Sequence, residues 1–140
     1  MEAAQNDNNH LLQTIQEEEI QMVLKKKNRP TAPGPDGIGY NLIKMMPQEW
    51  IHHLAMAYTQ ILHSGDIPPT WKEIYTHPIL KPNTAGHQAT DYRPISLLNT
   101  LRKIFEKIIH DRLTFYLERM HLWPATQFGF RKGFNTTFNI

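Results

Sequence analysis

The first helical pattern of apolar positions lies between residues 14 and 27. Ile20, Val23 and Leu24 form a narrow apolar stripe, and Thr14-Ile15-Gln16-Glu17 ahead of it fits a capping box. Acids fill the first turn and lysines the last, which complements the helix dipole. The pattern predicts an amphipathic helix that follows a polar lead-in over residues 1–13, which we expect to be disordered.

A second helical pattern covers residues 47–64. Pro47 suits a first-turn position, apolar residues recur at helical spacing from Trp50 to Leu62, and Gly65 stands where a left-handed C-cap belongs. We therefore predict a helix whose aromatic and Met residues lie in the core.

The longest apolar stripe runs from Leu97 to Met120 and predicts a long helix that ends at Trp123-Pro124. Ahead of it, residues 72–80 and 92–96 are rich in strand-forming residues and predict an antiparallel hairpin with a long tip. Pro78 cannot donate a hydrogen bond to a ladder, so its strand should lie at a sheet edge. The fold class that follows is α+β, mostly helical.

Composition and charge narrow the class of protein. The 140 residues include no Cys and no run long and apolar enough for a membrane span, and the N-terminus is polar, so we expect an intracellular protein of the cytoplasm or nucleus without a membrane partner. Residues 1–24 carry five acids and no base, whereas residues 72–140 carry ten bases and five acids. The basic half favours a polyanionic partner, and the alternative is a set of solvated helix faces.

The sequence contains no recognisable group of catalytic or metal-binding residues. The eight His lack metal-ligand spacing, neither a phosphate-binding loop nor a nucleophile elbow occurs, and the five Asp stand singly. A two-metal phosphoryl-transfer site needs clustered carboxylates. We therefore predict neither catalytic residues nor a metal site in this chain.

Four segments resemble one family in their order and spacing. They are APGPDGI at 32–38, PPTWK at 68–72 leading to PILKP at 78–82, DYRPISLL at 91–98, and QFGFR at 127–131. With the long helix between the last two, these segments look like the N-terminal part of the reverse transcriptase of non-LTR (LINE-like) retrotransposons.

The resemblance implies a partial reverse transcriptase domain over residues 14–140. It would comprise the fingers and the start of the palm of a right-hand polymerase, with a short β-hairpin, and stop before the catalytic palm strands. The complete enzyme would extend a DNA primer on an RNA template, using deoxynucleoside triphosphates (dNTPs) and Mg²⁺. Because the family's catalytic aspartates follow this segment, we expect the chain alone to be inactive and to hold no cofactor.

The same resemblance implies that Lys81 and Arg93 contact the incoming dNTP. Positive charge around a triphosphate offsets its negative charge, and Arg can do so through two hydrogen bonds. The alternative is an exposed hairpin lysine and an Arg93 paired with Asp91.

Nucleic-acid contacts are implied in two further places. Lys25, Lys26, Lys27 and Arg29, with Gly34 and Asp36 of the PGPDG loop, resemble a motif near the template, and Gly129, Arg131 and Lys132 are candidates for phosphate or template contact. The alternatives are lysines that complement a helix C-terminus and a rigid turn in which Asp36 bonds local amides.

The expected partners are an RNA template and a DNA primer, with association also possible through the apolar surface on which a palm would pack. Two other functions stay open: a non-catalytic RNA-binding module and a non-functional helical relic. RNA binding would show salt dependence, which the relic would lack.

Overall fold

The structure, a computed structural model, describes residues 10–27, 31–124, 126, 127, 129, 131 and 133. This part mixes helices with a two-stranded antiparallel sheet, so the predicted α+β class is confirmed. In chain order the elements are α2 (Glu17–Lys26), α3 (Tyr40–Lys44), α4 (Gln48–Ser64), the 3₁₀ helix η1 (Pro69–Lys72), β1 (Tyr75–Leu80), the 3₁₀ helix η2 (Ala89–Asp91), β2 (Tyr92–Leu97) and α5 (Thr100–Arg119).

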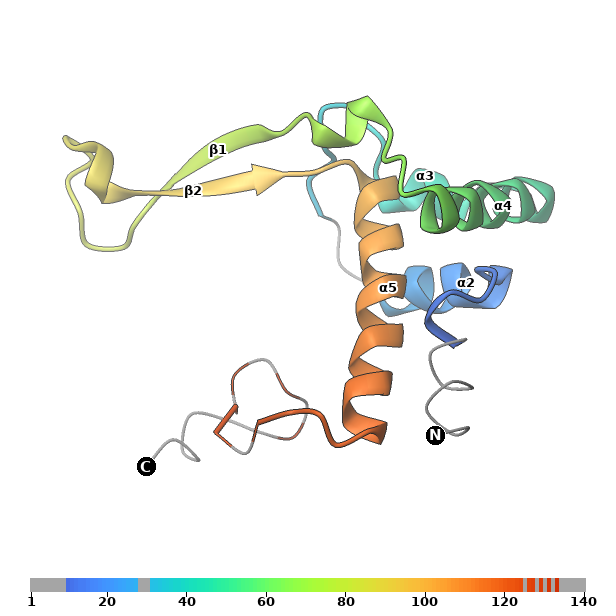
Figure 1. Cartoon of the computed structure of the whole chain (residues 1–140). Helices are drawn as coiled ribbons and strands as arrows, with labels where there is room; N and C mark the ends of the chain where they lie inside the picture. The colour runs from blue at the N-terminus through green and yellow to red at the C-terminus, as the bar shows by residue number, and fades with distance from the viewer. Residues whose placement is uncertain are drawn as a thin grey trace.

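Helix α5 is the spine of the molecule (Figure 1). Helices α2 and α4 lie on one side of it, and the β1–β2 hairpin extends from its N-terminal end on the other side. The hairpin is therefore a projection from a helical body and presents both of its faces to solvent: all six residues of β1 are exposed.

The core fills the space between the helices. Its buried apolar residues are Ile15, Ile20, Val23, Leu24, Tyr40, Ile43, Ile51, Ala55, Tyr58, Trp71, Ile104 and Ile108. Tyr58 is fully buried, and its hydroxyl donates to the Leu101 carbonyl oxygen at 2.7 Å. Its ring lies against Trp71 and Phe105, with centroids 6.0 and 5.4 Å away, so η1 and α5 meet α4 at one aromatic cluster.

The N-terminal helix forms where the sequence predicts it, but its cap does not. The N-cap is Gln16 rather than Thr14, and the Glu19 carboxylate accepts a hydrogen bond from the Gln16 N–H at 2.9 Å. Thr14 lies in the preceding segment, where its carbonyl oxygen accepts from Arg112. The predicted N-cap was therefore two residues too early, because Thr14 contacts Arg112 of α5 instead of capping the helix.

The predicted stripe of α4 is buried on a narrower face than expected. Ile51, Ala55 and Tyr58 recur at helical spacing and are buried, whereas Trp50 is 62% exposed. Trp50 precedes Ile51 by one position, which rotates it about 100° away from the buried face. The expected core position of Trp50 was wrong, and Pro47 is the N-cap rather than a first-turn residue. Gly65 is confirmed as a left-handed C-cap with φ 75°.

Helix α5 is shorter at both ends than the apolar stripe predicts. Leu97 pairs with Tyr75 in the hairpin, so the helix begins only at Thr100. It ends at Arg119, ahead of Trp123-Pro124: His121 adopts φ 52°, and the Leu122 N–H donates to the Leu117 carbonyl oxygen at 2.9 Å. This is a Schellman motif with His121 at the position that Gly usually occupies. The sequence therefore lacks the glycine that normally marks such a helix end.

The predicted hairpin is confirmed, with a tip that runs from Lys81 to Asp91. Both strands are edge strands, as expected for Pro78, and Pro78 lies opposite Pro94. The Lys81 N–H donates to the Asp91 carbonyl oxygen at 2.8 Å, so alternation makes the proline pair a non-hydrogen-bonded one. Each proline nitrogen then points away from the partner strand, and no ladder hydrogen bond is lost.

The lead-in predicted to be disordered makes tertiary contacts in its described part, residues 10–13. The Leu12 carbonyl oxygen bonds His63 Nε2 at 2.8 Å, and the Gln13 carbonyl oxygen accepts from Arg112 at 2.6 Å. Among the described helices, none is long and apolar enough to cross a membrane.

Candidate functional site

The β1–β2 hairpin brings together the two residues for which the family resemblance implies dNTP contact. The register pairs Ile79 with Arg93, and Lys81 follows opposite Asp91. Side chains alternate between faces along a strand, so Lys81 and Arg93 lie on the same face of the hairpin. They are diagonal neighbours, an arrangement that typically puts Cα atoms about 7–8 Å apart.

The surroundings of Lys81 and Arg93 differ. Lys81 is partly buried, and its Nζ donates to the Thr90 carbonyl oxygen at 2.7 Å across the hairpin tip. Arg93 is exposed and has no ion pair or hydrogen bond from its side chain within the described part of the chain, while an Asp91 carboxylate oxygen accepts from the Gln88 N–H at 3.1 Å. The alternative pairing of Arg93 with Asp91 is therefore not what the structure adopts.

The predicted lysine run lies at the C-terminus of α2, where it has structural contacts. Lys25 and Lys26 are in the last turn and Lys27 is the C-cap, so all three complement the helix dipole. Lys26 Nζ lies 3.9 Å from a carboxylate oxygen of Asp111, and Lys27 Nζ lies 5.7 Å from the Tyr40 ring centroid. Arg29 lies outside the described residues.

The PGPDG loop packs onto the start of α5. A Cβ atom at Gly34 would come within 2.5 Å of the backbone of Leu98 and Asn99, so only glycine fits there without a shift. An Asp36 carboxylate oxygen accepts from the Ile38 N–H at 3.0 Å, the local turn that the sequence left open as an alternative. Gly34 thus has a packing role, and Asp36 shapes the loop.

At the other end of the chain, Arg131 is engaged within the molecule. Its Nε and an Nη donate to the two carboxylate oxygens of Glu118 at 3.1 and 2.9 Å, and the guanidinium lies 5.5 Å from the Trp123 ring centroid. This hydrogen bonding lowers the pKa of Glu118. Gly129 accepts from the Gln127 amide at 3.1 Å, and Lys132 lies outside the described residues. The geometry thus gives Arg131 an internal partner.

A group of lysines that the sequence did not bring together surrounds the start of the PGPDG connection. Lys44 Nζ donates to the Lys27 carbonyl oxygen at 2.6 Å, and Lys103 Nζ to the Ala32 carbonyl oxygen at 3.3 Å. Lys27, Lys44 and Lys103, here called the lysine junction, come from α2, α3 and α5. Burial lowers the pKa of Lys103, the Lys27 charge lowers it further, and Asp36 opposes the shift. The charges of Lys27 and Lys103 are thus close enough to interact.

Sequence reasoning also missed Arg112, which is buried in a helix otherwise predicted as an apolar stripe. Its guanidinium donates to both carboxylate oxygens of Glu19, at 2.8 and 2.6 Å, and to carbonyl oxygens of the N-terminal segment, including that of Gln13. Burial would raise the pKa of Glu19, but the Arg112 hydrogen bond and charge hold it below its ordinary value. Arg112 therefore joins α2 and the N-terminal segment to α5.

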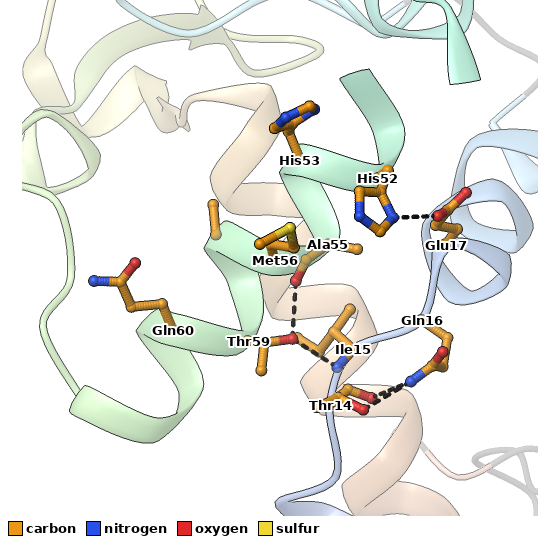
Figure 2. A pocket seen from close by; sticks show the side chains of 11 residues that line it. Thr14, Ile15, Gln16, Glu17, His52, His53, Ala55, Met56, Thr59 and Gln60 are labelled. Carbon is orange, nitrogen blue, oxygen red and sulfur yellow. Dashed lines mark hydrogen bonds and ion pairs between the residues drawn. The ribbon is translucent and has the colours of Figure 1, made fainter. Parts of the chain in front are cut away.

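A groove lies between residues 14–17 and α4 (Figure 2). Most of its polar side chains are paired, whereas the Gln60 amide has no partner among the described residues. Thr59 Oγ1 accepts from the Ile15 N–H and donates to the Ala55 carbonyl oxygen, both at 2.9 Å, and His52 bonds Glu17 at 2.7 Å. The groove thus holds the N-terminal segment against α4 and lies across the molecule from the hairpin.

The described residues contain no group of three or more His, Asp or Glu placed to hold a metal ion. A pair of Mg²⁺ ions would need such a group of carboxylates. These residues therefore do not fit a catalytic metal centre.

The chain is similar to proteins of transposable elements. It is 34% identical over 129 residues to the probable RNA-directed DNA polymerase from transposon BS of Drosophila melanogaster, which covers 92% of the chain. It is 32% identical to the RNA-directed DNA polymerase from mobile element jockey of the same species, over 86% of the chain, and 31% identical to the retrovirus-related Pol polyprotein from type-1 retrotransposable element R1 of Bradysia coprophila, over 75%. The chain spans 14%, 13% and 10% of the lengths of these proteins. No protein-family model matches it.

Proposed function

Since the chain belongs to the RNA-directed DNA polymerases of non-LTR retrotransposons, we propose that it supplies their fingers and that its β1–β2 hairpin contacts the phosphates of the incoming dNTP. The observation that carries the proposal is the placement of Lys81 and Arg93 on one face of an exposed ribbon. Both can meet one phosphate chain there.

The chemistry of the two side chains supports different tasks. Arg93 is exposed, and its planar guanidinium can donate two parallel hydrogen bonds to phosphate oxygens. Lys81 is held at the tip by Thr90, which keeps its ammonium group beside the same face. In this assignment the hairpin binds and orients the triphosphate. The Mg²⁺ ions and the carboxylates that hold them belong to another part of the polymerase.

Nucleic-acid contact is the second part of the proposal. The lysine junction gathers three cations around one connection, with Asp36 as the acid that acts on Lys103. Such a group favours the phosphate backbone of RNA without reading its sequence. Binding of RNA without chemistry is the alternative function that this observation favours. Either function places the protein inside the cell, with its RNA.

The dNTP contact is tested by NMR titration of the ¹⁵N-labelled chain with dTTP at pH 7.5. We expect shift changes centred on the amides of β1 and β2, and an apparent affinity weakened several-fold by Arg93→Ala or Lys81→Ala. Lys72→Ala is the matched control, because it removes one charge from η1 ahead of the hairpin. Shift changes away from the hairpin, or equal losses in all three variants, would contradict the proposal.

A further inference from the structure

The hairpin face that carries Lys81 and Arg93 holds a third basic side chain, that of His77. The register pairs His77 with Ile95 and Ile79 with Arg93. His77 is therefore one diagonal step from Arg93, on the side away from Lys81. Three basic side chains follow one another along this face, with Arg93 in the middle.

The opposite face of the ribbon carries no charge. Its residues are Thr76, Pro78, Leu80, Tyr92, Pro94 and Ser96. The basic groups are thus segregated onto one face, which an isolated exposed hairpin does not need for its own stability. A ligand with an extended negative charge is what such a face fits.

Few titratable or charged side chains lie near His77. The titratable or charged residues on its face of the two strands and the first tip pair are Tyr75, Lys81, Asp91 and Arg93. Asp91 is the acid among them, and it lies beyond Arg93, bonded to the Gln88 N–H. Within the described part of the chain the exposed His77 has no hydrogen bond or ion pair. Its ring is free to meet a ligand.

The edges of the ribbon favour contact through the face. At the middle of each strand a proline nitrogen, Pro78 or Pro94, points outward and offers no hydrogen. A further strand would miss a hydrogen bond at that point on either edge, which disfavours strand addition. The accessible binding surface is therefore the face lined by the basic side chains.

We propose that His77 is a third phosphate-binding residue of this face and that, when protonated, it extends the contact with the phosphate chain of a nucleoside triphosphate. The proposal rests on the assignment of Lys81 and Arg93 to the dNTP. An unperturbed His has a pKa of about 6.5, so the contact is present near pH 5.5 and fades by pH 7.5.

The test is an NMR titration of the whole chain with dTTP at pH 5.5 and pH 7.5, at constant ionic strength. We expect His77→Gln to weaken the apparent affinity about two- to fivefold at pH 5.5, the range of an exposed ion pair, and to leave it unchanged at pH 7.5. Thr76→Gln, on the uncharged face, serves as the matched control and should have no effect at either pH.

The outcomes distinguish the role of His77 from the dNTP assignment of Lys81 and Arg93. If His77→Gln matches Thr76→Gln at pH 5.5 while Arg93→Ala weakens binding at both pH values, the role of His77 is overturned and the dNTP assignment stands. If Arg93→Ala also has no effect, the dNTP assignment itself fails. If His77→Gln weakens the binding of a single-stranded oligonucleotide at pH 5.5 as much as that of dTTP, at equal phosphate concentration, the face is reassigned to the nucleic-acid backbone and the triphosphate is overturned.

Discussion

At the scale of single residues, the most consequential side chain of the body is Arg112. It is 6% exposed, and its guanidinium serves one carboxylate and the carbonyl oxygens of a segment about 100 positions earlier in the chain. A buried guanidinium is tolerated only when its donors are satisfied, and here the acceptors are the Glu19 carboxylate of α2 and carbonyl oxygens of the N-terminal segment. One residue therefore decides how the N-terminus attaches to α5.

Replacing Arg112 with Met should lower the free energy of unfolding by about 3 kcal/mol, because Glu19 and the carbonyl oxygens of the N-terminal segment lose their donors. Urea unfolding followed by circular dichroism measures the change. Lys25→Met removes an exposed cation from α2 and should cost less than about 0.5 kcal/mol. Equal losses in the two variants would show that Arg112 does not hold the fold.

The pH dependence of stability should report the Glu19–Arg112 pair. The pKa of Glu19 in the folded chain lies below its ordinary value of 4.5, so its stabilisation is fully present above pH 4.5 and is lost as pH falls through the lower folded value. Glu19→Gln should therefore be less stable than the native chain at pH 7, and the difference should shrink at lower pH. Urea unfolding across this pH range checks it, with the exposed Glu18→Gln as control. A difference that stays constant with pH would contradict the coupling.

At the scale of elements, the ends of helices and the packing of loops depend on backbone contacts. The PGPDG loop reaches the β2–α5 connection at Gly34, and Thr100 at the start of α5 donates from its hydroxyl to the Ile38 carbonyl oxygen at 2.6 Å. These two contacts tie residues 34–38 to the point where the hairpin leaves the body. The loop thus braces the base of the hairpin.

Gly34→Ala should destabilise the chain by about 1–3 kcal/mol, because the added methyl group meets backbone rather than a movable side chain. Gly39→Ala is the matched control, since a Cβ there has nothing within 4 Å and Gly39 has φ −94°. Thermal unfolding of both variants gives the comparison. A Gly34→Ala chain as stable as Gly39→Ala would mean that the loop does not pack as described.

At the scale of the whole molecule, charge and apolar surface are distributed unevenly. The lysine junction lies on the helical body, while the basic face of the hairpin projects away from it. Several large apolar side chains are exposed on the helices, among them those of Trp50, Leu113 and Phe115. The molecule therefore offers two basic regions and an apolar surface beyond its own core.

Binding of single-stranded RNA should weaken with salt, and Lys103→Ala should reduce the slope of log K against log salt concentration by about 0.7, the value for one lost phosphate contact. Fluorescence anisotropy at several salt concentrations measures the slope. Lys72→Ala lies outside the lysine junction and should leave the slope unchanged. Affinity that does not depend on salt would exclude a phosphate contact.

The exposed apolar side chains should make the isolated chain associate at high concentration, because their burial between copies removes apolar area from water. Sedimentation velocity over a range of concentrations should show a rising average mass. A single monomer species at every concentration would contradict this expectation.

The sequence by itself determined the elements whose signals are local. The helical stripes locate most of α2, α4 and α5, the strand-forming residues and Pro78 locate the hairpin as an edge ribbon, and Gly65 marks a C-cap, because each depends on residues only a few positions apart. The placement of Lys81 and Arg93 on one face follows from a register that the hairpin sets through short-range contacts.

Only the tertiary structure decided which face of each helix is buried and which distant residues meet. Trp50 is exposed, Arg112 is buried and Leu97 belongs to a strand because of neighbours from other segments. The short helix α3, the close packing of Gly34 and the meeting of Lys27, Lys44 and Lys103 likewise depend on contacts between segments far apart in the chain. Local patterns do not contain the free energy of such contacts, so they could not predict them.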